Sequence, residues 1–131
     1  MTIKQNGFEV TNLGFSYYGR DILKDINLKN NQGEFVCLLG ESGSGKTTLL
    51  NLLAGLTKPS EGHVYWKGKE IEKPSAERSV VFQDYTLFPW LTLLQNVTLA
   101  IKKTKKLKTS YAKNLAEEYL NLVGLSGSLH K

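Results

Sequence analysis

Cysteine is almost absent from the sequence, which has one, Cys37, among 131 residues. A single cysteine excludes an internal disulfide framework and a zinc site built on paired cysteines, as suits a reducing compartment. Cys37 stands within an apolar run. We therefore expect it to lie in the core as a small apolar residue and not as a reactive thiol.

Long apolar runs are absent as well. No stretch approaches the ~20 apolar residues that a membrane-spanning helix needs, and residues 1–6 lack the apolar stretch of a signal peptide. The composition, 40% hydrophobic and 22% charged, lies in the range of globular proteins, and 131 residues suffice for one domain with a core. We therefore expect a single soluble domain, which leaves docking on a membrane protein open.

Acidic residues are outnumbered by basic ones, which gives a formal net charge of +5. Much of the excess comes from one run of lysines: Lys102, Lys103, Lys105, Lys106 and Lys108. No aromatic residue is interleaved among them, so the run offers no stacking platform for bases. We interpret it as a solvated helix end and expect no nucleic-acid partner.

The sequence does contain a complete phosphate-binding loop. Residues 40–47 fit the pattern G-x-x-x-x-G-K-[ST] without a mismatch. The glycines let backbone N–H groups approach phosphate oxygens. Lys46 can reach the β- and γ-phosphates, and the Thr47 hydroxyl can bind Mg²⁺. A following helix would add free N–H groups and a favourable dipole, so the loop predicts binding of a nucleoside triphosphate.

The flanks of the loop have the order that such a site requires. Residues 34–39 form an apolar run that predicts a buried strand before the loop. Residues 48–54 predict a helix after it, with leucines crowding one side and Gly55 as the C-terminal cap. Further on, residues 79–82 predict another buried strand, which delivers Gln83 into a loop.

The remaining patterns predict a small β element and two helices. Apolar alternation in residues 8–13, 22–28 and 63–66 predicts three further strands.

Thr92 and Gln95 form a capping-box pattern for a helix that reaches about residue 101. Ser110 as N-cap and Gly124 as terminator delimit a second helix. The predicted fold class is α/β: a P-loop nucleotide hydrolase-like core, an N-terminal antiparallel β element and the start of a helical subdomain.

Three segments in this order closely resemble the nucleotide-binding subunit of ATP-binding cassette (ABC) transporters: residues 13–28, 40–55 and 80–92. The stretch Leu-Phe-Pro-Trp-Leu-Thr is most similar to the importer subgroup for nitrate, sulfonates, taurine and related small anions. The resemblance implies that residues 1–131 are the N-terminal part of one ABC ATP-binding domain. Its parts are the phosphate loop at 40–47, the Q-loop around 83–90 and the start of the helical subdomain at 92–131.

The resemblance assigns roles to matching positions. Lys46 and Gln83 are the candidate catalytic residues, and Thr47 and Gln83 are the candidate Mg²⁺ ligands, since amide and hydroxyl oxygens suit a hard cation. Tyr17 fits the position that stacks on adenine better than Tyr18, although either ring offers a flat face. The candidate ATP-binding residues are Tyr17, Gly40, Glu41, Ser42, Gly43, Ser44, Gly45, Lys46, Thr47 and Thr48.

The resemblance also implies partners, namely membrane-spanning transporter subunits and a second ATP-binding subunit. The chain is then expected in the cytoplasm, peripheral on the inner face of the cell membrane. Residues 84–90 match the part that touches the membrane-spanning subunits. Tyr85, Phe88 and Trp90 are candidate anchors there; packing of Leu87, Phe88 and Trp90 inside the helical subdomain is the alternative.

Three motifs of an intact ABC domain are missing from the sequence: the L-S-G-G-Q signature, an apolar strand ending in Asp-Glu, and a switch histidine. Residues 125–128 lack the second glycine and the glutamine of the signature, and His130 stands too early to be the switch. The Asp-Glu pair of that missing strand, the Walker B motif, supports Mg²⁺ and orients or deprotonates the attacking water. We therefore expect weak MgATP binding and negligible hydrolysis by this chain alone.

These observations favour the N-terminal half of an ABC importer subunit whose parent couples MgATP hydrolysis to solute transport. The alternative is a non-hydrolysing nucleotide-binding or regulatory remnant that docks on a transporter partner. A small P-loop kinase is disfavoured, because the only arginines, Arg20 and Arg78, lie in no obvious lid that could clamp a phosphoryl group.

Overall fold

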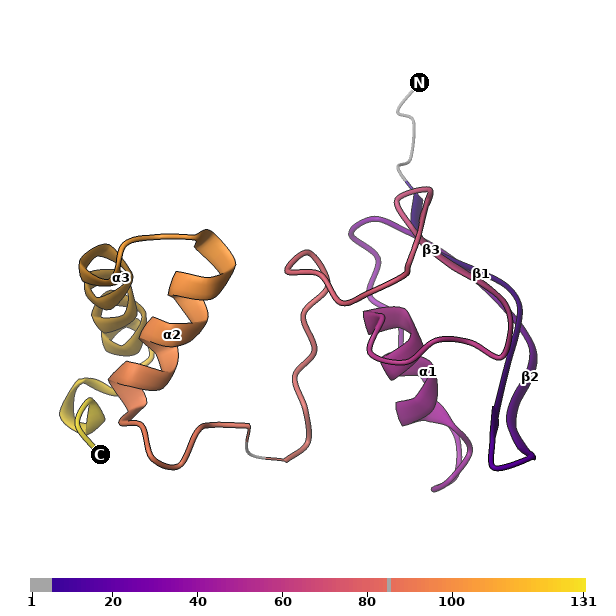
Figure 1. Cartoon of the computed structure of the whole chain (residues 1–131), viewed down its shortest axis with the longest axis horizontal. Coiled ribbons are helices and arrows are strands. Elements are labelled where there is room, and N and C mark those ends of the chain that lie inside the picture. Colours follow the sequence, from indigo (N-terminus) through magenta and orange to yellow (C-terminus); the bar gives the residue numbers. More distant parts are fainter. Residues whose placement is uncertain (1–5, 85) are drawn as a thin grey trace. The chain divides into compact units, whose positions relative to one another are not determined.

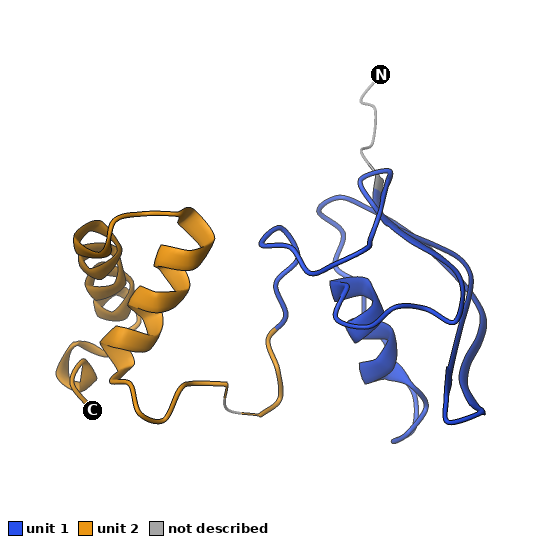
Figure 2. Cartoon of the chain, viewed as in Figure 1, with its two compact units in different colours: residues 1–80 blue, residues 81–131 orange. Residues whose placement is uncertain are grey.

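The computed structural model describes residues 6–84 and 86–131, and the chain divides into two compact units (Figures 1 and 2). Unit 1 spans residues 1–80 and unit 2 spans residues 81–131. Each unit has a hydrophobic cluster of its own. The phosphate loop belongs to unit 1, whereas Gln83 and the lysine run belong to unit 2.

Unit 1 is built on an antiparallel sheet with the strand order β2-β1-β3-β4. The strands are β1 (Asn6–Tyr17), β2 (Arg20–Asn31), β3 (Glu61–Trp66) and β4 (Lys69–Glu70). β1 and β2 form a hairpin whose last pair is Tyr17 with Arg20. The strands predicted at 8–13, 22–28 and 63–66 are therefore confirmed. The hairpin of β1 and β2 precedes the phosphate loop as expected, whereas β3 and β4, which complete the same sheet, follow the loop.

A bulge bends β1 where it passes β3. The register between these strands shifts after Thr11, and Asn12 has a positive φ of 47°. Gly62 of β3 lies against this bulge with φ at 72°. A Cβ at Gly62 would lie 2.2 Å from the carbonyl oxygen of Asn12. The two backbones are so close here that only glycine fits at this position.

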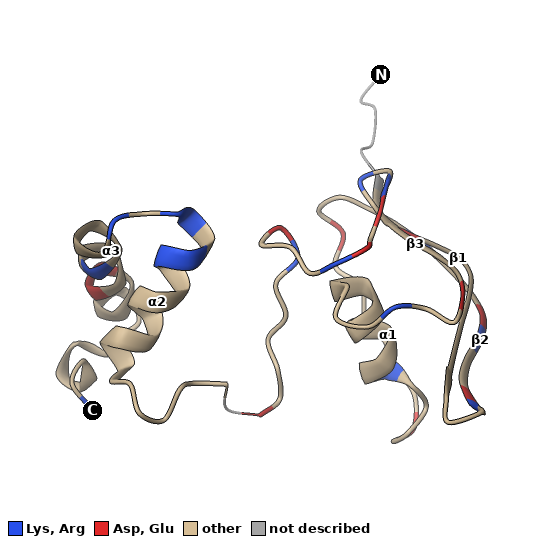
Figure 3. Cartoon of the chain, in the orientation of Figure 1, with Lys and Arg blue, Asp and Glu red and all other residues tan. Residues whose placement is uncertain are grey.

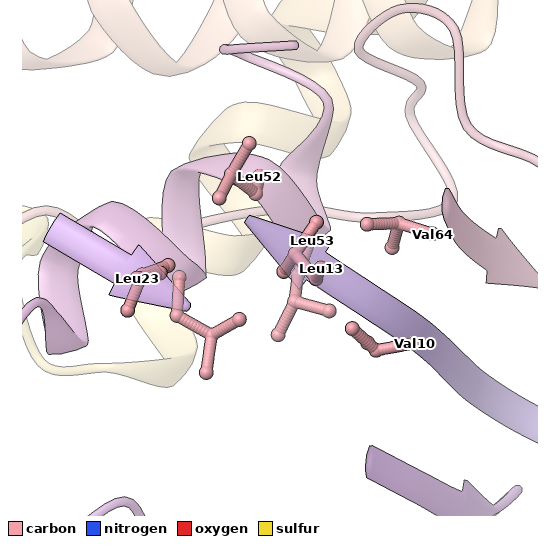
Figure 4. Close-up of a cluster of buried hydrophobic side chains, with 7 residues drawn as sticks. Val10, Leu13, Leu23, Leu52, Leu53 and Val64 are labelled. Atoms are coloured by element: carbon pink, nitrogen blue, oxygen red, sulfur yellow. The ribbon is translucent and has the colours of Figure 1, made fainter. Parts of the chain in front are cut away.

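Helix α1 (Lys46–Ala54) contributes its leucines to the core of unit 1 (Figure 4). The buried residues of the cluster are Val10, Leu13, Leu23, Leu49, Leu52, Leu53 and Val64. The helix ends at Gly55 in the left-handed conformation, with φ at 77°, as the sequence predicted. Burial of these side chains fixes α1, and with it the phosphate loop at its N-terminus, against the sheet.

Two predicted strands are wrong. Residues 34–39 and 79–82 form no strand, and Phe35, Leu39 and Val81 are 94%, 93% and 99% exposed. Cys37 is also exposed and does not lie in the core. An apolar run predicts burial in a sheet, but a strand forms only where neighbouring segments pair with its backbone. In the described part of the chain, no segment pairs with either run.

Unit 2 consists of helices α2 (Leu93–Lys105) and α3 (Thr109–Leu122) and the short 3-10 helix η1 (Ser126–Ser128). Its buried apolar residues are Leu94, Ile101, Ala112, Ala116 and Leu120. The end of α3 before Gly124, with φ at 75°, agrees with the prediction. Its start does not, because the N-cap is Lys108 and not Ser110. Leu107 packs against the cluster, and this contact sets where the chain turns into α3.

The first turn of α2 has every N–H group bonded. Thr92 and Gln95 form the predicted capping box, with N···O distances of 2.9 and 3.2 Å. The N–H groups of Leu93 and Leu94 donate to the carbonyl oxygens of Lys131 and Leu129, at 3.0 and 3.1 Å. Residues 129 and 131 therefore lie against the first turn of α2.

None of the helices within residues 6–84 and 86–131 has the length and apolar character needed to cross a bilayer.

Candidate nucleotide-binding site

The phosphate loop, residues 40–47, takes a conformation that depends on its glycines. Gly43 and Gly45 have φ angles of 81° and 88°, in the left-handed region that glycine reaches at little cost. At Gly40 a Cβ would lie 2.8 Å from the Ser44 hydroxyl oxygen. The loop therefore turns tightly on itself and brings its backbone close to any bound anion, as the sequence pattern predicted.

Helix α1 begins with an open N-terminus. Its N-cap, Gly45, makes no side-chain hydrogen bond, and no acidic residue stands in the first turn. The N–H of Leu49 bonds the carbonyl oxygen of Gly45 at 2.9 Å. The three preceding amides, of Lys46, Thr47 and Thr48, have no intrahelical acceptor. Unlike α2, whose first amides are all bonded, α1 presents donors and the positive end of its dipole to an anion.

The Lys46 side chain folds back over the phosphate loop. Its Nζ donates to the carbonyl oxygens of Gly40, at 2.8 Å, and Glu41, and contacts the Ser44 hydroxyl oxygen at 3.2 Å. The ammonium group is thus held above the loop by neutral oxygens and forms no ion pair within the described residues. A phosphate oxygen could replace these oxygens and gain a charge-assisted bond.

Gly45 also joins the loop to the β1–β2 hairpin. A Cβ at Gly45 would lie 2.8 Å from Cδ2 of Leu23 and 3.3 Å from the carbonyl oxygen of Ile22. Tyr17 pairs with Arg20, three residues along β2 from Leu23. Three residues of strand span about 10 Å. Tyr17 and the phosphate loop therefore lie at the same hairpin of unit 1, at positions about 10 Å apart along β2.

The two candidate adenine-stacking residues differ in exposure. Tyr17 is 59% exposed and Tyr18 is 93% exposed. Their ring centroids are 4.5 Å apart, and the planes meet at 73°, an edge-to-face contact. Tyr18 forms the turn itself, with φ at 47°. Tyr17, at the end of β1, is the more firmly held ring of the two, because its backbone pairs with Arg20 in the sheet.

The Mg²⁺ site predicted at Thr47 is compatible with the structure. Thr47 stands in the first turn of α1 and is exposed. Among the described residues, no group of three or more His, Cys, Asp and Glu side chains is placed to hold a metal. Mg²⁺ often takes only one or two protein ligands and completes its shell with phosphate oxygens and water. A single hydroxyl beside the phosphate loop fits an ion that arrives with its nucleotide.

Gln83 is exposed and belongs to unit 2, while Lys46 and Thr47 belong to unit 1. The strand predicted to carry Gln83 does not form. Its role as a second Mg²⁺ and water contact stays a prediction.

Asn96 is a structural residue that the sequence analysis missed. It is the one polar side chain classed as buried in the described part of the chain, 8% exposed. Its Oδ1 accepts from the Phe88 N–H at 2.8 Å. Its Nδ2 lies 3.0 to 3.1 Å from the carbonyl oxygens of Phe88, Leu91 and Thr92. An asparagine among the apolar residues at the start of α2 was the available signal, because a buried amide needs partners.

We expect Asn96→Ala to lower the free energy of unfolding of unit 2 by about 2–3 kcal/mol, because the amide of Phe88 and the surrounding carbonyls lose their partner. Urea unfolding measures this change, and hydrogen exchange at the Phe88 amide should become faster. Asn114→Ala, on the exposed face of α3, is the control and should change stability little. Equal effects of the two substitutions would contradict the assigned role of Asn96.

Asn96 holds a turn that presents apolar side chains outward. Leu87, Phe88 and Trp90 are 56%, 45% and 75% exposed. The rings of Phe88 and Trp90 contact each other, with centroids 5.4 Å apart. Of the two sequence interpretations, this exposure favours candidate anchors over internal packing. Tyr85 lies outside the described residues.

Known proteins are similar to this chain in both sequence and fold. Residues 23–131 match the ABC transporter family. The nitrate import ATP-binding protein NrtD of Synechococcus elongatus is 44% identical over 110 residues, which are 83% of this chain and 40% of that protein. The bicarbonate transport ATP-binding protein CmpD of Synechocystis sp. is 45% identical over 111 residues, 84% of this chain and 39% of that protein. The chain thus spans about 40% of the length of these relatives.

Solved structures agree with the sequence match. The ATP-binding cassette MJ0796, in a dimeric post-hydrolysis state bound to ADP and Pi, is 30% identical and superimposes with a TM-score of 0.79. The match covers 95% of this chain and 61% of that one. The predicted α/β fold class is therefore confirmed, and the chain belongs to the ABC transporter family.

Proposed function

We propose that the phosphate loop of this chain binds the phosphates of MgATP, as part of the ATP-binding subunit of an ABC importer. The observation that carries the proposal is the pairing of two features at one place. The N-terminus of α1 leaves three amides without intrahelical acceptors. The Lys46 ammonium lies over the same loop, where it bonds neutral oxygens that a phosphate oxygen can replace. Together they provide donors and positive charge for a phosphate chain.

Within this proposal, residues 40–48 surround the phosphates, and Tyr17 stacks on the adenine. The hydroxyl of Thr47 supports Mg²⁺, which when bound would neutralise phosphate charge. Gln83 is proposed as a further contact to the ion and to water. The domain parts are proposed as the sequence indicated them: the phosphate loop at 40–47, the Q-loop at 83–90 and the helical subdomain from 92, all within one ABC ATP-binding domain.

The proposed partners are membrane-spanning transporter subunits and a second ATP-binding subunit. The dimeric state named for the cassette MJ0796 supports the second partner. Exposed Phe88 and Trp90, held by Asn96, are the proposed anchors for the first. The corresponding location is the cytoplasmic face of the cell membrane. The names of the relatives favour a small inorganic anion, of the nitrate or bicarbonate type, as the solute of the parent transporter.

The proposal is tested by titrating the 131-residue chain with ATP in the presence of Mg²⁺, by calorimetry, and by following phosphate release in parallel. We expect weak, saturable binding and no turnover above background, because the sequence has no strand ending in paired carboxylates to activate water. Absence of binding at millimolar MgATP would contradict the proposal. Turnover that disappears in Lys46→Ala would instead show that the chain hydrolyses ATP by itself.

A further inference from the structure

We propose that the lysine cluster of unit 2, formed by Lys102, Lys103, Lys105, Lys106 and Lys108, is a docking surface for anionic lipid headgroups. The cluster covers the last turn of α2 and the connection to α3, where Figure 3 shows basic residues gathered at the end of α2. It is distinct from the phosphate loop, which lies in unit 1.

All five lysines are exposed, and none forms an ion pair within the described residues. Lys105 contacts an uncharged partner, with its Nζ 3.3 Å from the Tyr119 hydroxyl oxygen. The nearest acidic residue along α3, Glu117, lies 3.9 Å from Lys113 and outside the cluster. In the part of the chain that the structure describes, these positive charges therefore have no carboxylate partner within ion-pair distance.

The helix dipoles account for only part of this arrangement. Lys102, Lys103 and Lys105 lie in the last turn of α2, where the dipole favours cations. Lys108, however, is the N-cap of α3, at the positive end of that helix, and makes no capping bond. Thr109 and Ser110 follow directly, and either residue type would make a better N-cap. A cation at this position is opposed by the dipole of α3, and an external anion lying against it would offset this cost.

The geometry of the cluster suits a broad surface. Leu107, between Lys106 and Lys108, packs on the core of unit 2, so the backbone that carries these two lysines is anchored there. Tyr111, in the first turn of α3, is 68% exposed, and an amphipathic ring of this kind favours a lipid–water interface. A lone ring provides no platform for successive bases, so single-stranded nucleic acid is the poorer fit.

Near an anionic bilayer, each lysine contributes about a fivefold gain in partitioning at low salt. Five lysines acting together raise partitioning by about three thousandfold if their contributions multiply. Screening reduces this gain as the Debye length shortens from about 10 Å at 0.1 M salt to about 3 Å at 1 M. The interaction should depend steeply on both lipid charge and salt.

The experiment is sedimentation of the full chain with vesicles of phosphatidylcholine alone or with one part in three phosphatidylglycerol. We expect binding only to the anionic vesicles, and its loss at 1 M NaCl. Replacing the five cluster lysines with Gln lowers the formal net charge from +5 to 0. This variant should bind at least about a hundredfold more weakly. The matched control makes the same charge change in unit 1: Lys24→Gln, Lys58→Gln, Lys67→Gln, Lys69→Gln and Lys73→Gln.

Equal losses in the two variants would overturn the proposal, because net charge and not the cluster would then cause binding. Equal binding of the unmodified chain to neutral vesicles, or tighter binding to single-stranded RNA than to anionic vesicles, would overturn it as well. Lys46→Ala should leave vesicle binding unchanged. Failure of the lipid proposal is thereby distinguished from failure of the proposed nucleotide site, which the same variant does affect.

Discussion

The Lys46→Ala chain is expected to bind MgATP about 10- to 100-fold more weakly than the unmodified chain. Each bond to a charged group contributes about 1.5–3 kcal/mol, and the substitution removes the only ammonium group that lies over the phosphate loop in the described residues. Stability should change little, because the oxygens that Lys46 contacts are exposed and can bond water instead. Calorimetric titration and thermal unfolding measure the two quantities separately.

Lys58→Ala is the matched control for this prediction. Lys58 is exposed in the turn that follows α1, so its removal makes the same change in net charge away from the loop. Its affinity for MgATP should stay within a factor of about two of the unmodified chain. If Lys46→Ala and Lys58→Ala bind MgATP equally well, the phosphates do not occupy the loop at 40–47.

Gly62→Ala is expected to have the largest effect on stability, a loss of more than about 4 kcal/mol. The added Cβ would lie 2.2 and 2.4 Å from the carbonyl oxygens of Asn12 and Thr11, and these are backbone atoms held in the sheet. Gly62 also has a positive φ of 72°, which L-residues rarely adopt. Because domains are stable by only about 5–15 kcal/mol, most of the stability of unit 1 would be lost.

Gly68→Ala separates the steric clash of the added Cβ from the strain of the positive φ. Gly68 has a similar φ, 76°, but a Cβ there would meet nothing within 4 Å. Its substitution should cost only the backbone strain, about 1–2 kcal/mol. Urea unfolding of both variants gives the difference. Equal losses would mean that β1 and β3 do not approach as closely at Gly62 as the structure has them.

The sequence predicted those parts of the fold that depend on local interactions. The phosphate loop needs glycine at positions of positive φ, the capping box joins Thr92 to Gln95, and Gly55 and Gly124 end their helices. Each of these signals acts over a few residues, so each could be read from the chain directly.

The parts of the fold that were predicted wrongly or missed depend on contacts that the local sequence pattern does not specify. Residues 34–39 and 79–82 have the apolar character of buried strands, but whether a strand forms is decided by segments that pair with it from elsewhere. The position of Cys37 was wrong for the same reason. Asn96 was missed because its four contacts lie in a turn whose conformation cannot be deduced from its composition. The start of α3 at Lys108 was set by packing of Leu107 and not by the better capping residues beside it.

The hydrogen bonds from Leu93 and Leu94 to the carbonyls of Lys131 and Leu129 bring residues 93 and 131 of unit 2 side by side. The two ends of the segment from 93 to 131 therefore adjoin within unit 2. Segments with adjoining ends can be inserted, exchanged or circularly permuted without redirecting the chain around them. By this criterion the helical segment from 93 to 131 is a structural module of unit 2.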